Sequence, residues 1–442
     1  MIVLSPKMQL LSIVITCLCI QGCGYLNLIS HQKTLESLIK TAPSVSLKKE
    51  LNPDRCYTLY GTTKSLLIDK FPLAIAAFSF QYGKQELVDY HIMSGEGYYS
   101  LFLPEGRYFL YAFSDLNLDN KFGINECTGI YENELVLSDS NYFSRVIGGI
   151  DFRISPRPVN VNLDPFDLAI PENFHVSDSR PFPPGTLRSL DDPIFSKDAA
   201  MKGVFSPSDF LKIAPMHFYA ITKFDEKKIP VVFVHGYSGH PQEFRFITDN
   251  IDTTKFQSWF FYYPSGQRLD RSGEVLYEIF LSGNIIKLRQ KRIVIFAHSM
   301  GGLVARYALN KYSKQHSTDD QIDYISASTP YGGNTDAENG IKTMPVVVPS
   351  WLDLSANSPF IKNLNATSLS PNIRFFLFFS FKNNGPVTMG QNSDGAIVLN
   401  SQLYPDAQKA AFQVMGFDAT HEGILLCPEM VKVLNSILLK KF

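Results

Sequence analysis

The second half of the chain alternates short apolar runs with amphipathic segments. The apolar runs are rich in β-branched and aromatic residues on both faces, which is typical of buried parallel strands. They occupy residues 229–236, 259–264, 293–297, 324–328, 375–381 and 412–416. The segments 272–289 and 428–440 carry apolar residues at helical spacing. This alternation predicts an α/β fold over residues 201–442, with a mostly parallel sheet and helices on both faces.

The first half of the chain follows a different pattern, without helical periodicity. Short aromatic strands are separated by turn signals at residues 57–61, 73–78, 86–90, 97–103 and 106–113. Their even spacing predicts a small β-sandwich domain over residues 51–155. Pro104, Glu105 and Gly106 predict a tight hairpin between the last two strands. Residues 156–200 are rich in proline and predict an extended linker.

The N-terminus has the pattern of a targeting segment. Lys7 precedes an apolar run over residues 10–20, which is too short to span a bilayer as a mature helix. The run ends in Gly22 and Cys23, a pair that resembles a bacterial lipobox. The resemblance implies a lipoprotein signal peptide over residues 1–22, acylation of Cys23 and a tether over residues 23–50. Two acyl chains would hold the protein on a membrane surface.

The remaining sequence fits an exported protein without a membrane-spanning helix. Gly24 lacks the acidic character of an inner-membrane retention signal, so we expect a membrane-anchored lipoprotein of a bacterial outer membrane. No second long apolar run follows, and we expect no transmembrane helix. Lys and Arg number 41 against 42 Asp and Glu, so no basic excess indicates a nucleic-acid partner.

Three further cysteines follow Cys23. An exported protein is permissive for disulfides, and Cys56 and Cys127 fall in the same predicted domain. They could pair or stay reduced, because a sequence does not fix the distance between them. Cys427, at the start of the last helix, is expected to be a buried free thiol.

The segment from Asp115 to Glu126 allows two interpretations. Oxygen ligands at alternate positions and a glutamate at the end are typical of a calcium loop. Asn120, however, replaces the glycine of the sharp turn, and Lys121 adds a positive charge. An Asx-rich turn at a strand end is the interpretation that we favour.

The run 293–297 leads through His298 directly into Ser299, and a helical pattern begins at once. A sharp strand-to-helix turn of this kind holds a serine hydroxyl exposed at its apex, flanked by small residues such as Ala297 and Gly301. The Met300 backbone N–H would then point toward a developing oxyanion. The strand 229–236 ends in His235 and Gly236, and the Tyr237 N–H is the expected second donor.

A serine nucleophile needs a base and an acid, and the strand pattern indicates where they lie. Asp394 follows the phenylalanine-rich run 375–381 and is the expected acid; Asp418 is its rival. His421 follows the last strand and is the expected base. His298 and His235 are expected to be structural hydrogen-bonding residues.

The sequence from about residue 203 resembles the lipase and esterase branch of the α/β-hydrolase superfamily. The resemblance rests on the His-Gly strand end, the Ala-His-Ser-Met-Gly-Gly-Leu-Val-Ala-Arg turn at 297–306 and the Thr-Pro strand end at 329–330. It implies that Ser299, Asp394 and His421 form a catalytic triad.

The expected function is therefore that of a membrane-anchored serine hydrolase that cleaves acyl esters. It needs no metal and no organic cofactor, and its partners are an acyl ester or lipid substrate and the membrane. Two alternatives stay open, an acyltransferase on the same triad and an inactive surface binding protein. Apolar residues over 351–364 could form a lid over an acyl pocket or pack as ordinary helices.

Overall fold

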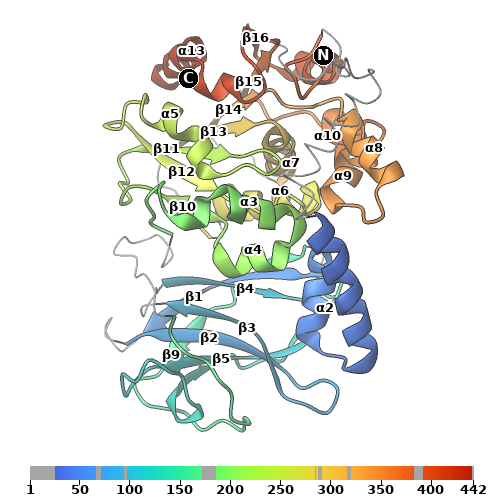
Figure 1. The fold of residues 1–442 in the computed structure, drawn as a ribbon. Helices are drawn as coiled ribbons and strands as arrows, with labels where there is room; N and C mark the ends of the chain where they lie inside the picture. Colours follow the sequence, from blue (N-terminus) through green and yellow to red (C-terminus); the bar gives the residue numbers. More distant parts are fainter. Residues whose placement is uncertain are drawn as a thin grey trace, which may run out of the picture.

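The computed structural model describes residues 25–440, except 66–70, 94–96, 143, 172–185, 284, 287–290, 316–319 and 383–391. Cys23 and the signal peptide predicted over residues 1–22 lie outside the described residues. The described chain forms an N-terminal β-sandwich and a C-terminal α/β domain that pack against each other (Figure 1). No helix among the described residues combines the length and apolar character needed to cross a membrane.

The α/β domain is built on a sheet in the order β10-β12-β11-β13-β14-β15-β16. Its strands are β10 (Phe218–Ala220), β11 (Ile229–Val234), β12 (Phe256–Phe261), β13 (Arg292–His298), β14 (Gln321–Ala327), β15 (Ile373–Ser380) and β16 (Gln413–Phe417). All neighbouring pairs are parallel except β10 with β12 at one edge. The predicted, mostly parallel sheet is thus confirmed, and the parallel strands end along one edge.

Helices cover both faces of this sheet, as expected. Ile293 and Ile295 pack with α6 (Leu269–Phe280) and α7 (Met300–Gln315) in one core. Val294 and Phe296 alternate with them and pack on the other face, with α5 (Arg245–Thr248) and α13 (Pro428–Leu439). Because both faces are covered, the central strands β11 and β13 are apolar along most of their length, which produced the continuous apolar runs 229–236 and 293–297 in the sequence.

Several shorter elements complete the domain. The helices are α3 (Lys197–Phe205), α4 (Pro207–Ile213), α8 (Thr335–Thr343), α9 (Pro349–Leu354), α10 (Pro359–Ala366), α11 (Leu399–Gln402) and α12 (Pro405–Ala410). Its 3-10 turns are η3 (Pro193–Phe195), η4 (Pro241–Phe244) and η6 (Gly423–Leu426), whereas η1 (Pro53–Arg55) and η2 (Ile124–Glu126) lie in the N-terminal domain. In the segment considered as a lid, Leu354, Ile361 and Leu364 are buried in the core beside α7. These residues therefore pack as ordinary helices.

The N-terminal domain consists of two sheets with an apolar core between them. One sheet contains β1 (Tyr57–Ser65), β4 (Gly97–Leu103), β8 (Val146–Ile147) and β9 (Phe152–Ile154). The other contains β2 (Leu73–Ser79), β3 (Glu86–Met93), β5 (Gly106–Ser114), β6 (Cys127–Ile130) and β7 (Leu135–Leu137). The hairpin predicted at Pro104, Glu105 and Gly106 is wrong, because β4 pairs with β1 whereas β5 pairs with β2. The short connection crosses between the sheets instead.

The proline-rich segment departs from the extended linker that was expected. Residues 159–170 lie against the outer face of the second sheet, and Leu163 and Leu168 are buried there. Backbone hydrogen bonds from Val159 to Cys127 and from Ile170 to Asn120 attach the segment to the sandwich. Prolines fix an extended backbone, and the apolar side chains between them give that backbone a surface to cover. At its other end, Leu187 bridges to β10 and therefore belongs to the α/β domain.

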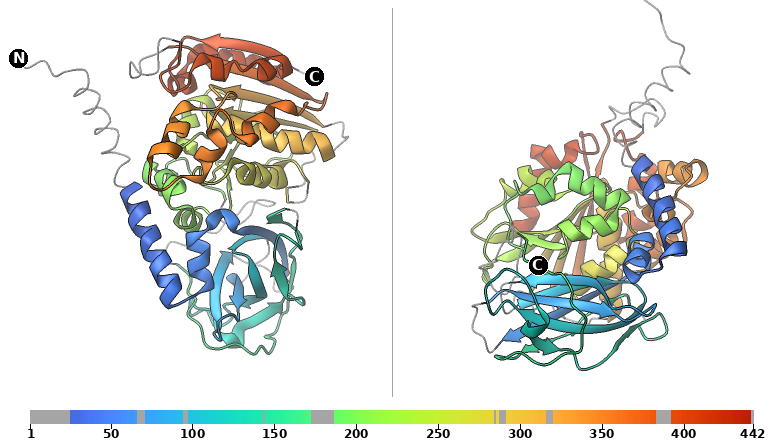
Figure 2. Two further views of the ribbon diagram at one scale, coloured as in Figure 1. Left: turned by 90° about the vertical axis from the view of Figure 1, so that its right-hand side faces the viewer. Right: turned by 60° about the horizontal axis from the view of Figure 1, so that its bottom comes forward.

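The two domains share an apolar interface. Tyr60 and Val146, on the outward face of the first sheet, are buried in the same core as α6 and α7. Polar contacts surround it: Ser144 Oγ donates to Glu274 at 2.6 Å, and Arg271 donates to the Cys56 carbonyl at 2.6 Å. The expected tether is also ordered in part, as a helix over residues 25–41 and as α2 (Val45–Leu51). Figure 2 shows this helix beginning beside the α/β domain and running along the sandwich.

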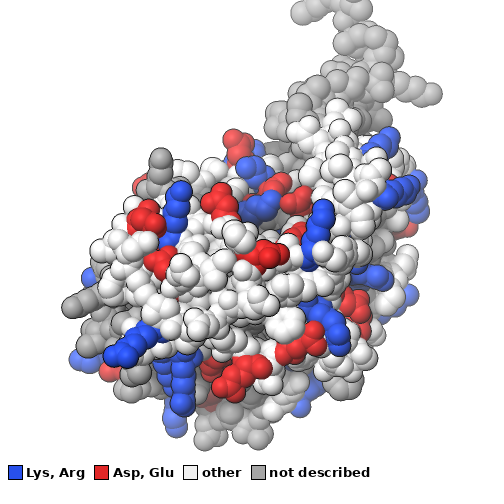
Figure 3. All heavy atoms as spheres, turned by 90° about the horizontal axis from the view of Figure 1, so that it is seen from below, with Lys and Arg blue, Asp and Glu red and all other residues white. Residues whose placement is uncertain are grey.

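The charged side chains of the sandwich are mixed in sign. Figure 3 shows the underside of the molecule, where Lys, Arg, Asp and Glu alternate around an uncharged centre. This face therefore presents no surface of a single sign that would attract a polyanion.

Candidate active site

Ser299 lies on the turn between β13 and α7, with its backbone at φ 54°. Left-handed backbone is costly for a residue with a side chain and persists only where the surroundings hold it. Here the Ser299 N–H donates to the Ala327 carbonyl at 2.8 Å, and the Ser299 carbonyl accepts from the Gly302 N–H at 2.9 Å. The turn thereby holds the side chain at the carboxyl edge of the sheet, where it is 8% exposed.

Glycines allow this turn to pack against the neighbouring strand ends. A Cβ at Gly301 would lie 2.3 Å from the His235 carbonyl oxygen, and one at Gly302 would lie 1.9 Å from Thr329 Oγ1. The sequence analysis expected a small residue at Gly301 as part of the sharp turn itself. The structure gives a different reason, since the group that Gly301 accommodates is the end of β11.

His421 lies between Ser299 and Asp394. Its Nε2 is 2.8 Å from Ser299 Oγ, and its Nδ1 is 2.8 Å from Asp394 Oδ2. A carboxylate only accepts hydrogen bonds, so Nδ1 carries the proton and Nε2 is free to accept the serine proton. The loop is fixed by its backbone as well, because the His421 N–H donates to the Asp394 carbonyl at 2.9 Å.

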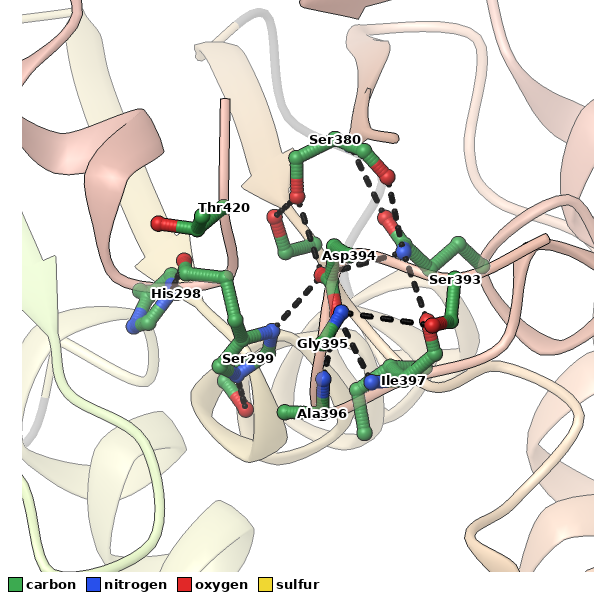
Figure 4. Close-up of polar contacts among 12 residues, drawn as sticks. His298, Ser299, Ser380, Ser393, Asp394, Gly395, Ala396, Ile397 and Thr420 are labelled. Carbon is green, nitrogen blue, oxygen red and sulfur yellow. Dashed lines mark hydrogen bonds and ion pairs between the residues drawn. The ribbon is translucent and has the colours of Figure 1, made fainter. Parts of the chain in front are cut away.

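Asp394 is buried among five hydrogen-bond donors (Figure 4). Besides His421, Oδ2 accepts from Ser380 Oγ at 2.9 Å and Gln402 Nε2 at 3.0 Å. Oδ1 accepts from the backbone N–H groups of Ala396 at 3.0 Å and Ile397 at 2.7 Å. Burial acts to raise the pKa of this carboxyl, but the contacts with His421 and the two N–H groups outweigh it and hold the pKa below its ordinary value.

The other candidate for the acid, Asp418, does not take the place of Asp394. Asp418 is exposed, whereas Asp394 contacts the His421 imidazole directly. The sequence analysis missed the residues that hold Asp394, namely Ser380 and Gln402. Ser380 had left a signal, because it is a lone hydroxyl at the end of a run of phenylalanines. Its proton goes to Asp394, so the Ser328 hydroxyl, 2.6 Å away, must donate to Ser380 in turn.

Gly236 brings the end of β11 against Ser299. A Cβ at Gly236 would lie 2.9 Å from Ser299 Cβ and 3.3 Å from Oγ. The Gly236 carbonyl is bonded to His235 Nδ1 at 2.8 Å and to the Gly239 N–H at 3.2 Å. Since the C=O and N–H of a trans peptide point in opposite directions, the Tyr237 N–H faces away from both groups. Within the described hydrogen bonds, the N–H groups of Tyr237 and Met300 have no acceptor.

The other two histidines hold the loops of the site. His235 Nε2 accepts from the Tyr263 N–H at 3.2 Å, which leaves the proton on Nδ1 for the Gly236 carbonyl. His298 lies close to His421 but bonds its carbonyl through Nε2 at 2.9 Å and not the serine. Burial lowers the pKa of each imidazole to about 3, so both are neutral near pH 7.

The order of these groups along the fold decides the superfamily. The serine follows a central parallel strand, the acid follows β15, and the histidine follows β16 in the chain order Ser-Asp-His. The C-terminal domain is an α/β hydrolase. A family model described as lecithin:cholesterol acyltransferase matches residues 281–343, which include β13, Ser299 and α7 of the hydrolase domain. No curated protein sequence matches the chain.

Solved structures with a similar arrangement include lipases. The chain is 17% identical to the Bacillus licheniformis lipase BlEst2 in its propeptide form, with a TM-score of 0.41 over 51% of this chain and 54% of that one. For Aspergillus fumigatus lipase B the identity is 16% and the TM-score 0.38, over 54% of this chain and 60% of that one. For the Legionella pneumophila phospholipase PlaB the identity is 16% and the TM-score 0.32, over 40% of this chain and 45% of that one.

The loop that could have bound calcium uses its carboxylates internally. Glu126 accepts from the N–H groups of Leu116, Asn117 and Gly123, and Asp115 from those of Asp119 and Asn120. The Asx-rich turn therefore describes this segment. Among the described residues no cluster of three or more His, Cys, Asp or Glu side chains could hold a metal.

The cysteines of the described chain are reduced. Cys56 and Cys127 are buried free thiols, so the disulfide considered between them is not formed. They belong to opposite sides of the sandwich, since Cys56 precedes β1 of the first sheet and Cys127 begins β6 of the second. Cys427 is also free but only half-buried, not buried as expected.

Proposed function

We propose that this protein is a serine hydrolase that cleaves carboxylic esters of acyl chains. The observation that carries the proposal is the continuous hydrogen-bonded line from Ser299 Oγ through the His421 imidazole to Asp394. Beside it lie two backbone N–H groups, of Tyr237 and Met300, that are unpaired within the described hydrogen bonds. A nucleophile, a base, an acid and two oxyanion donors are the groups that acyl transfer requires.

In the first half of the reaction, Ser299 Oγ attacks the ester carbonyl while His421 Nε2 takes its proton. The carbonyl oxygen becomes an oxyanion, which accepts hydrogen bonds from the Tyr237 and Met300 N–H groups. His421 then returns the proton to the departing alcohol, and an acyl-enzyme on Ser299 remains. In the second half, His421 takes a proton from water, the hydroxide attacks the acyl carbonyl, and the acid leaves as Ser299 recovers its proton.

Asp394 and the oxyanion donors stabilise the charges that form during the proposed reaction. Asp394 stays ionised because its hydrogen bonds lower its pKa, so it stabilises the imidazolium that forms when His421 is protonated. In hydrolases from which one oxyanion donor has been removed, the activation free energy rises by about 3 kcal/mol. Each donor is therefore expected to stabilise the transition state by about that amount.

Turnover of p-nitrophenyl esters of increasing acyl length tests the proposal. We expect the wild-type protein to hydrolyse at least the short esters, and Ser299→Ala and His421→Ala to lose that activity while they stay folded. Activity that survives in Ser299→Ala would overturn the proposed nucleophile. A folded wild-type protein that hydrolyses none of the esters would favour a surface binding protein instead.

One observation favours an acyltransferase as a second candidate. The family model that matches residues 281–343 is described as an acyltransferase. In that reaction, an alcohol takes the place of water in the second half and accepts the acyl group from Ser299. Adding a long-chain alcohol to the esterase reaction separates the two: a transferase yields the new ester, whereas a hydrolase yields free acid at an unchanged rate.

We also propose that the chain is an exported lipoprotein held on a membrane by acylated Cys23, which would bring the site close to lipid substrates. The lipobox-like sequence before Cys23 supports this. Metabolic labelling with a fatty-acid analogue should mark the wild-type protein and not Cys23→Ala. Equal labelling of both would contradict the proposal.

A further inference from the structure

Tyr25, the first residue of the N-terminal helix that the structure describes, touches the hydrolase domain. Tyr25 is 7% exposed, although it lies far from the hydrolase domain in sequence. Its hydroxyl donates to the Val346 carbonyl at 2.7 Å and accepts from the Val346 N–H at 2.9 Å. Its ring stacks on Trp351 of α9, with centroids 6.4 Å apart, and meets the edge of Phe205 at 6.0 Å.

Beyond Tyr25, Leu28 and Ile29 of the helix also pack against the cluster that contains Phe205 and Val348. A hollow of about 480 Å³ lies between the helix, the turn from α3 to α4 and the segment 345–349. His31 and Leu35 of the helix line this hollow on one side, and Phe205 and Val348 line it on the other. Among the described residues of this helix, the hydrogen bonds to the hydrolase domain are those of Tyr25 with Val346.

Trp351 connects Tyr25 to the loop beside Ser299. Its indole Nε1 donates to the Tyr237 hydroxyl at 3.2 Å. Tyr237 is also packed against both the Tyr25 cluster and the main core of the hydrolase. Three aromatic side chains thus lie in series from the N-terminal helix to the loop that carries the proposed oxyanion donor.

The backbone on both sides of Tyr237 is held by hydrogen bonds. Its preceding peptide is held by His235, and the Ser238 N–H that follows donates to Ser265 Oγ at 3.0 Å. Ser238 itself has φ 52°, a conformation that relaxes unless the neighbouring groups hold it. Within the described hydrogen bonds, the Tyr237 hydroxyl is held by Trp351 Nε1.

We propose that Tyr25 is a positioning residue of the active site, which acts through Trp351 to hold the Tyr237 N–H where the oxyanion forms. The proposal rests on the oxyanion role proposed above for Tyr237. It assigns the N-terminal helix to the hydrolase site, although this helix precedes the sandwich in the chain.

Tyr25→Ala in the full-length protein tests this directly. We expect kcat for a short ester to fall about tenfold with KM nearly unchanged, because misplacing a transition-state donor affects the transition state more than substrate binding. Affinity for a trifluoromethyl ketone, whose adduct with serine carries an oxyanion, should fall by a similar factor. Trp351→Phe, which removes the indole N–H together with part of the ring, should reproduce part of both losses.

Two control variants show whether the loss of activity is specific to the Tyr25 side chain. Leu26→Ala changes the neighbouring residue, whose side chain is 65% exposed, and should leave kcat unchanged. Tyr25→Phe keeps the ring stack and should retain more activity than Tyr25→Ala. Active-site titration corrects every rate for the folded fraction.

The outcomes separate the two proposals. If wild-type protein turns over the ester while Tyr25→Ala matches Leu26→Ala in kcat and ketone affinity, the positioning role is overturned. A rise in KM alone would overturn it too, since that change belongs to substrate binding. If the wild-type protein has no activity at all, the proposed function fails instead.

Discussion

At the scale of single residues, the site depends on which proton each group carries. Asp394 receives five hydrogen bonds and stays ionised, and this holds the proton of His421 on Nδ1. The Nε2 lone pair then faces Ser299 Oγ at 2.8 Å. Neither His235 nor His298 competes, because both are buried, neutral and bonded to backbone carbonyls.

Asp394→Asn tests this tautomer argument. The amide would donate a proton to His421 and turn the wrong nitrogen toward Ser299, so we expect kcat to fall by about 10⁴-fold with little change in KM. The matched control is Asp418→Asn, an exposed carboxylate three positions from His421, which should retain wild-type rates. Steady-state kinetics on folded protein measures both, and similar losses in the two variants would contradict the assignment.

At the scale of elements, the turn between β13 and α7 determines where Ser299 sits. Its glycines are small because neighbouring strands end against them, Gly301 at β11 and Gly302 at Thr329 after β14. The turn, the end of β11 and the end of β14 therefore pack as one unit. A change in any of them moves Ser299 relative to the N–H groups of Tyr237 and Met300.

Gly302→Ala should destabilise the protein by about 2–3 kcal/mol, since its Cβ would overlap Thr329 Oγ1 within a packed core. Gly123→Ala is the control, because the nearest atom to its new Cβ lies at an ordinary 3.7 Å. That variant should stay within about 0.5 kcal/mol of wild type. Urea unfolding curves give both values, and equal stability of the two variants would show that the turn can relax.

The sequence predicted the parallel sheet and the positions of Ser299, Asp394 and His421 because these follow from local pattern. Each apolar run ends in a polar residue, and parallel strands bring those ends to one edge. The crossing from β4 to β5 and the packing of residues 159–170 depend on contacts between distant segments, which leave no local signal. Tyr25 was missed for the same reason, since its partner Trp351 lies in the other domain.

At the scale of the whole molecule, the sandwich and the hydrolase form one packed body. Tyr60 of the first sheet is buried in the hydrolase core, and its hydroxyl is 3.3 Å from His217 Nδ1. Buried imidazoles occur in both domains and at their junction. Burial lowers the pKa of His91 and His217 to about 4, as it lowers those of His235 and His298 to about 3.

These histidines make stability depend on pH. In the unfolded chain each of these histidines binds a proton near pH 6.5. In the folded protein the same histidines bind a proton only when the pH falls to about 4 or 3. The free energy of unfolding should therefore fall as the pH drops from 6.5 to 4, by about 1.4 kcal/mol per pH unit for each histidine. Burial raises the pKa of Glu243 to about 8, so this carboxyl binds a proton more readily in the folded protein than in the unfolded chain. Its effect on the pH dependence is opposite to that of a buried histidine and offsets the contribution of one of the four histidines.

Urea unfolding between pH 7 and pH 4.5 measures this slope. His217→Gln removes one titrating group and should make the slope shallower by about one proton, whatever its effect on stability at pH 7. A slope that is unchanged in this variant would mean that His217 is accessible to protons in the folded protein.

The most direct test of the account is the site of covalent capture by a fluorophosphonate, which reacts with a serine activated by its base and an oxyanion hole. We predict that the wild-type protein is labelled, that peptide mass spectrometry places the label on Ser299 alone, and that Ser299→Ala and His421→Ala are not labelled. A folded wild-type protein that is left unmodified, or one that carries the label on another serine, would contradict it.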